Sequence, residues 1–348
     1  MARASSAERL QRAWLSRGLL ARSLLPLAWL YACVTGIRRQ LFRVGLMRSE
    51  SLAVPVVVVG NLVAGGAGKT PTVMAIVTAL RSAGYTPGVI SRGYGGIADE
   101  PIEVTRDVPP NQSGDEPLLI HLRTRAPVVV GRRRAAAAQH LLARHELVDV
   151  IVSDDGLQHL ALARDVQVLV FDERGGGNGW LLPAGPLREA LPAAVPARTL
   201  VVYNAEAAAT PLAGTLVKRA LSGAVLLRDW WRGEPATMSA LHLLQGHPLV
   251  AAAGLARPER FFEMLRREGL SITPRALPDH HDFASLPWAA HTPNVIVTEK
   301  DAIKLDPERM GASRVWVAPL DFQLDATFVS TLIAMLPPPG TRHGNTSA

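Results

Sequence analysis

An apolar β-branched run that leads directly into a glycine-rich loop constrains the fold of this chain more than any other feature. Residues 54–60 have the sequence VPVVVVG, and the loop after them ends in Gly68, Lys69 and Thr70. A strand without polar alternation is typical of a sheet covered on both faces. A Gly-Lys-Thr sequence between such a strand and a helix is typical of a phosphate-binding loop.

The same alternation of apolar strand and helix continues along the chain. Further strands are expected at 87–91, 126–131, 148–156, 165–172 and 198–204, with intervening helices that include 70–83 and one ending at His145. Strands separated by helices predict the α/β class, here a P-loop NTPase-like parallel sheet with helices on both faces. Ligands of such sheets bind beyond the carboxyl ends of the strands, so we expect functional residues there.

A smaller C-terminal α/β lobe is expected after the pattern loosens at 205–245. Residues 247–269 predict a strand, a turn and an amphipathic helix, while 294–305 and 314–322 predict two more strands. The expected organisation is a membrane-associated helical segment at 1–48, a P-loop core at 49–225, the smaller lobe at 226–338 and a disordered tail at 339–348.

The positive charge of the chain is concentrated at its N-terminus. The whole chain has a formal net charge of +7, and residues 1–50 contain nine arginines against two glutamates. The remainder is therefore nearly neutral, which argues against a nucleic-acid partner and favours a basic N-terminal arm. The single cysteine, Cys33, excludes an intrachain disulfide, and no Cys/His cluster has the spacing of a zinc site.

The basic arm contains a run of fourteen uncharged residues, 24–37, with arginines on both sides. The run is short for a spanning helix, whereas Trp29 and Tyr31 suit the headgroup boundary of a bilayer. The main hypothesis is an amphipathic or shallowly inserted helix on a membrane. One alternative is a cleaved signal ending at Cys33, which would carry a nucleotide loop away from ATP. Another is an ordinary hydrophobic helix packed on the core.

The glycine-rich loop departs from the strict pattern G-x-x-x-x-G-K-[ST], because Val63 stands where the first glycine belongs. Its later glycines allow backbone N–H groups to face a phosphate, while Lys69 can reach the β- and γ-phosphates and Thr70 can bind Mg²⁺. The alternative is a tight structural loop. The expected nucleotide-binding residues are Gly65, Gly66, Ala67, Gly68, Lys69, Thr70 and Pro71.

Acidic residues stand at three places where phosphoryl-transfer chemistry could use them. Asp154 and Asp155 end the strand expected at 148–156, where a P-loop enzyme holds Mg²⁺, although Asp-Gly is also a hairpin signal. Asp115 lies in an expected polar loop and could accept a hydroxyl proton, or simply be solvated. Asp279 and His280 form a possible orienter and base, or an exposed turn.

Two glycine-rich segments, 91–96 and 177–191, add possible anion-binding and substrate-binding side chains. They contain Arg92, Asn178 and Arg188, and arginine is suited to bidentate contact with phosphate. Each of these signals is weak by itself.

Taken in order, the motifs resemble one family. GNLVAGGAGKTP, SRGYGG, GDEP, SDDGLQH, NGWLLPAGPLRE, PDHHDF and TEKDAIK follow one another as in tetraacyldisaccharide 4′-kinases, the lipid A kinases of Gram-negative bacteria, and the resemblance covers residues 15–335. It implies ATP- and Mg²⁺-dependent phosphorylation of the 4′-hydroxyl of a tetraacylated glucosamine disaccharide 1-phosphate. It also implies an N-terminal helix on the cytoplasmic face of the inner membrane.

The resemblance assigns roles by position. The matching residues are the loop's Lys69 and Thr70, the catalytic acidic residue Asp115, the tandem aspartates Asp154 and Asp155, and the histidine of the smaller lobe, His280. Because His281 stands beside His280, the choice between the two histidines stays open. The lipid disaccharide and the inner membrane are the expected partners, and no obligate protein partner is evident.

Two other classes of function compete with a kinase. A P-loop GTPase of the metallochaperone type would need the guanine-recognition motif [NT]-K-x-D, but in TEKD (298–301) Lys300 and Asp301 are adjacent. A non-catalytic membrane scaffold would bind nucleotide without transferring phosphate.

Overall fold

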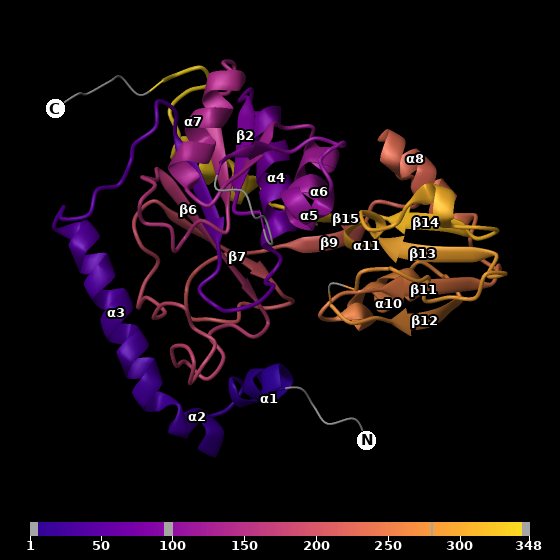
Figure 1. Cartoon of the computed structure of the whole chain (residues 1–348), viewed down its shortest axis with the longest axis horizontal. Helices are drawn as coiled ribbons and strands as arrows, with labels where there is room; N and C mark the ends of the chain where they lie inside the picture. The colour runs from indigo at the N-terminus through magenta and orange to yellow at the C-terminus, as the bar shows by residue number, and fades with distance from the viewer. Residues whose placement is uncertain (1–5, 94–99, 280, 343–348) are drawn as a thin grey trace.

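The computed structural model describes residues 6–93, 100–279 and 281–342 of the 348-residue chain. A larger and a smaller α/β lobe lie next to each other, joined by a narrow two-stranded ribbon (Figure 1). The longest N-terminal helix, α3, runs along the side of the larger lobe away from the smaller one, and α1 lies below the larger lobe in this view (Figure 1).

The larger lobe is built on an eight-stranded sheet in which neighbouring strands are parallel except at β3. In spatial order its strands are β3 (Ile102–Glu103), β4 (Val128–Val130), β2 (Pro87–Ser91), β5 (Val150–Asp154), β1 (Val56–Gly60), β6 (Val166–Asp172), β7 (Thr199–Asn204) and β8 (Thr215–Leu216). Val59 pairs with Asp154, so the loop after β1 and the aspartates after β5 emerge side by side. The predicted parallel sheet is confirmed.

Successive residues of β1 pack on opposite faces of this sheet, as a pleated strand requires. Val57 and Val59 face a cluster formed with α4 (Lys69–Ser82), α6 (Asp115–Thr124) and α12 (Ala326–Ala334). Val56 and Val58 face a second cluster, formed with α7 (Arg134–Arg144). Burial on both faces explains why the strand has no polar alternation, and each buried valine stabilises the fold by roughly 1.5–3 kcal/mol.

The smaller lobe contains a five-stranded sheet covered by short helices. Its strands are, in order, β10 (Val225–Leu226), β14 (Arg314–Ala318), β13 (Asn294–Thr298), β11 (Leu249–Ala253) and β12 (Ile272–Ala276), and its helices are α8 (Leu227–Arg232), α9 (Met238–His242), α10 (Pro258–Arg267), α11 (Glu299–Ala302) and the 3₁₀ turn η1 (Pro307–Arg309). The ribbon between the lobes pairs β9 (Lys218–Leu221) with β15 (Leu320–Gln323).

Several expectations for the C-terminal half need correction. The strand expected at 294–305 ends at Thr298, whose hydroxyl accepts a hydrogen bond from the Asp301 amide and so caps α11. The strand expected at 314–322 is divided at Pro319, which has no N–H to donate.

The chain also returns to the larger lobe after the ribbon, within the segment expected to belong to the smaller one. Helix α12 packs against α4, and the Tyr85 hydroxyl donates to the carbonyl of Pro337 at 2.7 Å. Within the expected tail, the Gly340 amide donates to Asp149 at 2.8 Å.

The N-terminal arm consists of α1 (Ser6–Ala13), α2 (Leu19–Ser23), α3 (Leu25–Arg43) and the turns between them. Polar contacts tie it to the larger lobe, and its small apolar residues Ala21 and Ala28 are buried. Tyr31 donates to the Arg188 carbonyl at 3.0 Å, and Arg39 pairs with Glu189 at 3.2 Å. The outer face of α3 is apolar and exposed, which disfavours a helix packed on the core. In the described part of the chain, no helix has the length and apolarity to span a membrane.

Candidate active site

A cleft of about 1210 Å³ lies at the carboxyl ends of the larger sheet, between the two lobes. The glycine-rich loop contributes Gly65, Gly66 and Lys69, and the smaller lobe contributes Asp279, Asp282, Lys300 and Lys304. Tyr31 and Arg38 of α3 line the same cleft, so the arm takes part in it directly.

The glycine-rich loop has the backbone geometry that its glycines allow. Gly65 and Gly68 have φ angles of +97° and +87°, and Gly68 forms the N-cap of α4. A Cβ at Gly68 would collide with the amide of Asn204, so a larger residue is excluded there. The Lys69 amine lies 3.2 Å from the Asn61 side-chain oxygen and 3.5 Å from Asp155. A lysine at a helix N-terminus beside exposed glycines can bind an anionic phosphate.

Val63 occupies the position of the missing glycine because the start of this loop is paired with another segment. Val63 forms a β-bridge with Leu187, and both side chains are buried. The Ala64 amide donates to the Pro186 carbonyl at 2.8 Å, and the Arg188 amide donates to the Leu62 carbonyl at 2.7 Å. The loop therefore takes its open shape after residue 63 rather than before it.

The tandem aspartates after β5 have different environments. Asp154 is 2% exposed, accepts a hydrogen bond from the Ser91 hydroxyl at 3.3 Å, and has a second oxygen, Oδ1, without a partner. Burial, reinforced by Glu116 and opposed by Lys69, raises the pKa of Asp154 to about 7. A buried carboxylate oxygen without a partner fits a cation that is bound only with the substrate.

Asp155 instead forms ion pairs on the surface of the cleft. It lies 3.5 Å from Lys69 and 3.3 Å from Arg188, and its φ angle of +48° turns it away from the path of the strand. The hairpin alternative is wrong, since β1 lies between β5 and β6. Among the described residues, no three His, Cys, Asp or Glu side chains form a metal site by themselves. Mg²⁺ would therefore need phosphate oxygens and water as well.

Asp115 is not in a loop, as the sequence suggested, but is the first residue of α6. It follows Gly114, which has a φ angle of +86°, and its carboxylate lies 3.3 Å from Lys304 of the smaller lobe. Lys304 also donates to the His281 carbonyl at 3.0 Å. Asp115 and the smaller lobe thus meet across the cleft.

The predicted histidine, His280, lies outside the described residues. The neighbouring His281 has a structural contact: its Nδ1 accepts a hydrogen bond from the Phe283 amide at 3.0 Å, and its ring packs edge-on against Phe283. The Asp301 side chain is fully buried and accepts hydrogen bonds from the Gly254 amide and the Thr298 hydroxyl, so it does not face a nucleotide base.

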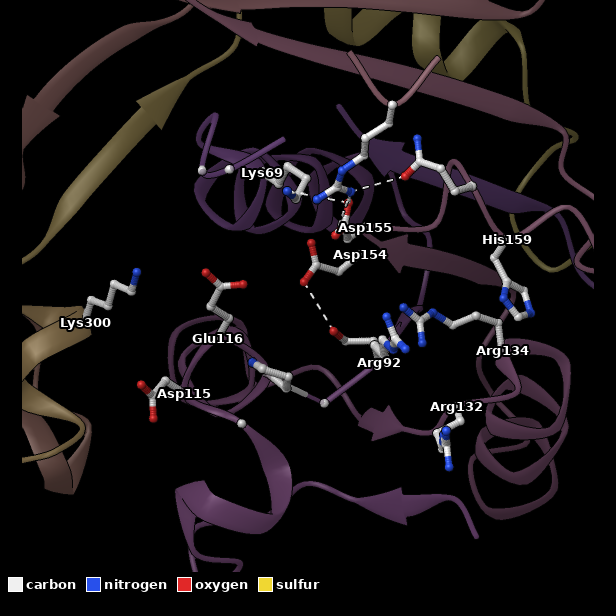
Figure 2. A pocket seen from close by; sticks show the side chains of 18 of the residues that line it. Lys69, Arg92, Asp115, Glu116, Arg132, Arg134, Asp154, Asp155, His159 and Lys300 are labelled. Atoms are coloured by element: carbon white, nitrogen blue, oxygen red, sulfur yellow. Dashed lines mark hydrogen bonds and ion pairs between the residues drawn. The ribbon is translucent and has the colours of Figure 1, made fainter. Parts of the chain in front are cut away.

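Basic residues line the far side of the cleft, and of these only Arg92 was predicted from the sequence. Figure 2 shows Arg92, Arg132 and Arg134 on the opposite side of Asp154 from Lys300. Arg134 is 2% exposed, and its Nε has no partner. Burial, opposed by the two aspartates, lowers the pKa of Arg134 to about 10, so it remains charged at neutral pH. The GRRR sequence at 131–134, directly after β4, is the pattern from which this basic group could have been predicted.

Of the three residues expected to bind substrate, two line the cleft and one does not. Arg92 and Arg188 line the cleft. Asn178 does not line it: its side-chain amide donates to the Ser16 carbonyl of the N-terminal arm at 3.1 Å and to the Ala184 carbonyl of its own lobe at 2.9 Å. Its position identifies Asn178 as a tether of the arm.

Comparison with known proteins places these features in one family. A family model described as tetraacyldisaccharide-1-P 4′-kinase (LpxK) matches residues 20–337. The chain is 54% identical over 335 residues to tetraacyldisaccharide 4′-kinase of Leptothrix cholodnii, covering 95% of this chain and 96% of that protein. It is 53% identical over 339 residues to the enzyme of the same name from Methylibium petroleiphilum, covering 96% and 95%.

The fold is similar to a crystal structure of LpxK from Aquifex aeolicus in complex with ATP. The TM-score is 0.75 at 26% sequence identity, and the match covers 92% of this chain and 100% of the other. The similarity in fold therefore extends over both lobes.

Proposed function

The chain belongs to the tetraacyldisaccharide-1-P 4′-kinase family, and from that premise we propose the roles of the residues in its cleft. The reaction is transfer of the γ-phosphate of ATP to the 4′-hydroxyl of a tetraacylated glucosamine disaccharide 1-phosphate, which gives lipid IVA. One observation supports the assignment most: Lys69, the unpaired buried carboxylate of Asp154, and Asp115 line one cleft.

The glycine-rich loop binds the triphosphate. The N–H groups of residues 65–68 and the amine of Lys69 neutralise the β- and γ-phosphates. Lys69 thereby stabilises the charge that develops on the leaving oxygen. Thr70 and Pro71 follow Lys69 in the first turn of α4.

Thr70 and Asp154 are the residues proposed to hold Mg²⁺, which would supply positive charge to offset that of the phosphates. Oδ1 of Asp154 has no partner, and the pKa of this carboxyl group is raised. Both observations support the assignment, because a bound cation would give Oδ1 a partner and would stabilise the ionised carboxylate. Asp155 contributes by its contacts with Lys69 and Arg188, which it holds in place.

Asp115 accepts the proton of the 4′-hydroxyl as the oxygen attacks the γ-phosphorus. It lies at a helix N-terminus on the acceptor side of the cleft, where Lys304 holds its carboxylate. His280 is proposed as its partner on the strength of the family resemblance. Positioning and charge neutralisation then supply most of the catalysis.

The arginines at the far side of the cleft suit the phosphate that the disaccharide already carries. A substrate with a reacting hydroxyl at one end and a phosphate at the other requires a basic site separated from the acceptor aspartate. Arg92 and Arg134 meet this requirement, because they line the same cleft beyond Asp154 (Figure 2). Arginine is suited to bidentate binding of such a phosphate.

The N-terminal arm places the cleft at a membrane. The exposed apolar face of α3 would lie in the headgroup region, and Tyr31 and Arg38 on the same helix line the cleft. The proposed location is the cytoplasmic face of the inner membrane, where ATP is supplied, with peripheral or shallow insertion.

Incubation of the protein with ATP labelled in the γ-phosphate and the lipid disaccharide tests the proposal. We expect label on the lipid at the 4′ position, no transfer by Lys69→Ala, and normal transfer by Lys218→Ala, which alters an exposed lysine on β9. Release of labelled phosphate without labelled lipid would contradict a kinase, and a requirement for GTP would favour the switch-protein alternative. ATP binding without either product would favour a scaffold.

A further inference from the structure

Arg174 lies behind the glycine-rich loop and contacts two of the loop's backbone carbonyls. Its Nη2 donates to the Gly66 carbonyl at 2.8 Å, and its Nη1 donates to the Ala64 carbonyl at 3.4 Å. Its Nε donates to the two carboxylate oxygens of Asp172, at 3.1 and 2.9 Å. Every nitrogen of the guanidinium thus has a partner, and two of them bond to the loop.

The carboxylate that binds the Arg174 guanidinium belongs to a strand of the larger sheet. Asp172 is the last residue of β6, which pairs directly with β1, the strand that precedes the loop. It is 9% exposed and also accepts a hydrogen bond from the Arg174 amide at 3.0 Å. The orientation of the guanidinium is therefore set by the sheet.

The contact determines which way the N–H groups of the loop point. In a trans peptide the C=O of one residue and the N–H of the next point in opposite directions. Because the carbonyls of Ala64 and Gly66 point toward Arg174, the N–H groups of Gly65 and Ala67 point away from it. Gly65 lines the cleft, and a Cβ there would lie 3.2 Å from Nη1 of Arg174.

We propose that Arg174 is a positioning residue for ATP: it holds the loop carbonyls so that the Gly65 and Ala67 N–H groups face the phosphates before the nucleotide arrives. The proposal rests on the function proposed above, since ATP is taken as the anion. Val63 stands in place of the early glycine of the strict pattern and is fixed by its bridge to Leu187. Arg174 contacts the part of the loop that follows Val63. Backbone N–H groups that already face the phosphate site do not have to be reoriented when ATP binds.

The shape of the guanidinium matters here as well as its charge. Arginine presents donors in a planar fork that can reach two carbonyls and a carboxylate at once, whereas lysine presents one ammonium at the end of a flexible chain. Lysine at position 174 would keep the positive charge near the phosphates but could not hold both carbonyls and Asp172.

The experiment measures ATP affinity without lipid, and then the KM for each substrate, for Arg174→Met and Arg174→Lys. Both variants are expected to bind ATP at least about tenfold more weakly, as the loss of hydrogen bonds to a charged group predicts, with the KM for lipid unchanged. Arg198→Met is the matched control, because Arg198 donates to the carbonyls of Asp165 and Met335 away from the cleft. It should bind ATP as the wild type does.

Wild-type ATP affinity in Arg174→Met would overturn the proposal, and so would recovery of affinity in Arg174→Lys, since charge alone would then explain the effect. Thermal unfolding establishes that each variant folds, and Arg174→Gln replaces the methionine variant if that one does not. If the wild-type protein binds ATP but phosphorylates no lipid, the proposed function fails, while the effect on ATP affinity still decides the role of Arg174.

Discussion

Lys304 of the smaller lobe lies 3.3 Å from the carboxylate of Asp115, the first residue of α6 in the larger lobe. The side chains are 10% and 21% exposed, so solvent screens the pair only partly. The pair spans the cleft at the place proposed for the acceptor hydroxyl. The surroundings of this carboxylate therefore depend on the position of the smaller lobe.

Asp154→Asn is expected to stabilise the protein at high pH in the absence of nucleotide and metal. Burial raises the folded-state pKa of Asp154 from 3.8 to about 7, so folding favours its protonated form. The wild type therefore loses stability as pH rises from about 4 to about 7, by at most about 4 kcal/mol, and the neutral asparagine avoids this loss.

Urea unfolding at pH 5 and pH 8 measures this effect, and the advantage of the variant should grow between the two. Asp149→Asn is the control, because Asp149 is buried but both its oxygens accept hydrogen bonds, from the amides of Thr86 and Gly340. That variant should lose stability. An advantage of Asp154→Asn that is equal at both pH values would contradict the assignment.

Arg123→Met is expected to destabilise the protein by about 3–5 kcal/mol, because it leaves a buried charge unpaired. Arg123 of α6 donates to both oxygens of Glu299, at 3.1 Å, and Glu299 is 4% exposed. Glu299 also accepts a hydrogen bond from the Trp230 indole at 3.0 Å. Since Arg123 and Glu299 belong to different lobes, the pair helps to fix the lobes relative to each other.

Urea unfolding of Arg123→Met, Glu299→Gln and the double variant gives the coupling energy of this pair. The exposed pair of Arg228 and Glu308 is the control, and Arg228→Met should cost no more than about 1 kcal/mol. A cost for Arg123→Met as small as this control would show that the pair between the lobes is not a structural link.

Serine substitutions at Leu27, Leu30 and Val34 are expected to release the protein from vesicles. These positions are three and four residues apart on α3, and their exposed fractions are 55%, 61% and 59%. Vesicle sedimentation measures the binding. Leu243→Ser changes a leucine in the smaller lobe that is 72% exposed, more than any of these three, and should leave binding intact. Unchanged sedimentation of the triple variant would argue against the arm as the membrane contact.

Six of the eight strands of the larger sheet could be predicted to within about two residues, because each is a buried run within the sequence, whereas the two-residue strands β3 and β8 at the sheet edges were not predicted. The expected strand 87–91 coincides with β2, and 165–172 differs from β6 by one residue. Each is a continuous apolar run, and a parallel sheet covered on both faces requires such runs. The loop lysine and the two aspartates could be predicted for a related reason, since they follow these strands.

Residues whose role depends on distant segments could not be predicted in the same way. Asp115 was expected in a loop, although acidic residues at 115 and 116 and a basic residue at 123 are typical of the two ends of a helix. Asn178 was expected to bind substrate, but its environment is formed by an arm more than 150 residues earlier in the chain. The unpaired Nε of Arg134 likewise depends on how α7 packs on the sheet.

The role of Asp115 as the proton acceptor is tested most directly by the turnover of Asp115→Asn. Asparagine keeps the size and most of the hydrogen bonding of the side chain but cannot accept the proton of the 4′-hydroxyl. Phosphorylation of the lipid is expected to fall by a factor of about 10²–10⁴, while ATP affinity stays at the wild-type value. Turnover equal to that of the wild type would show that Asp115 does not accept the proton in this cleft.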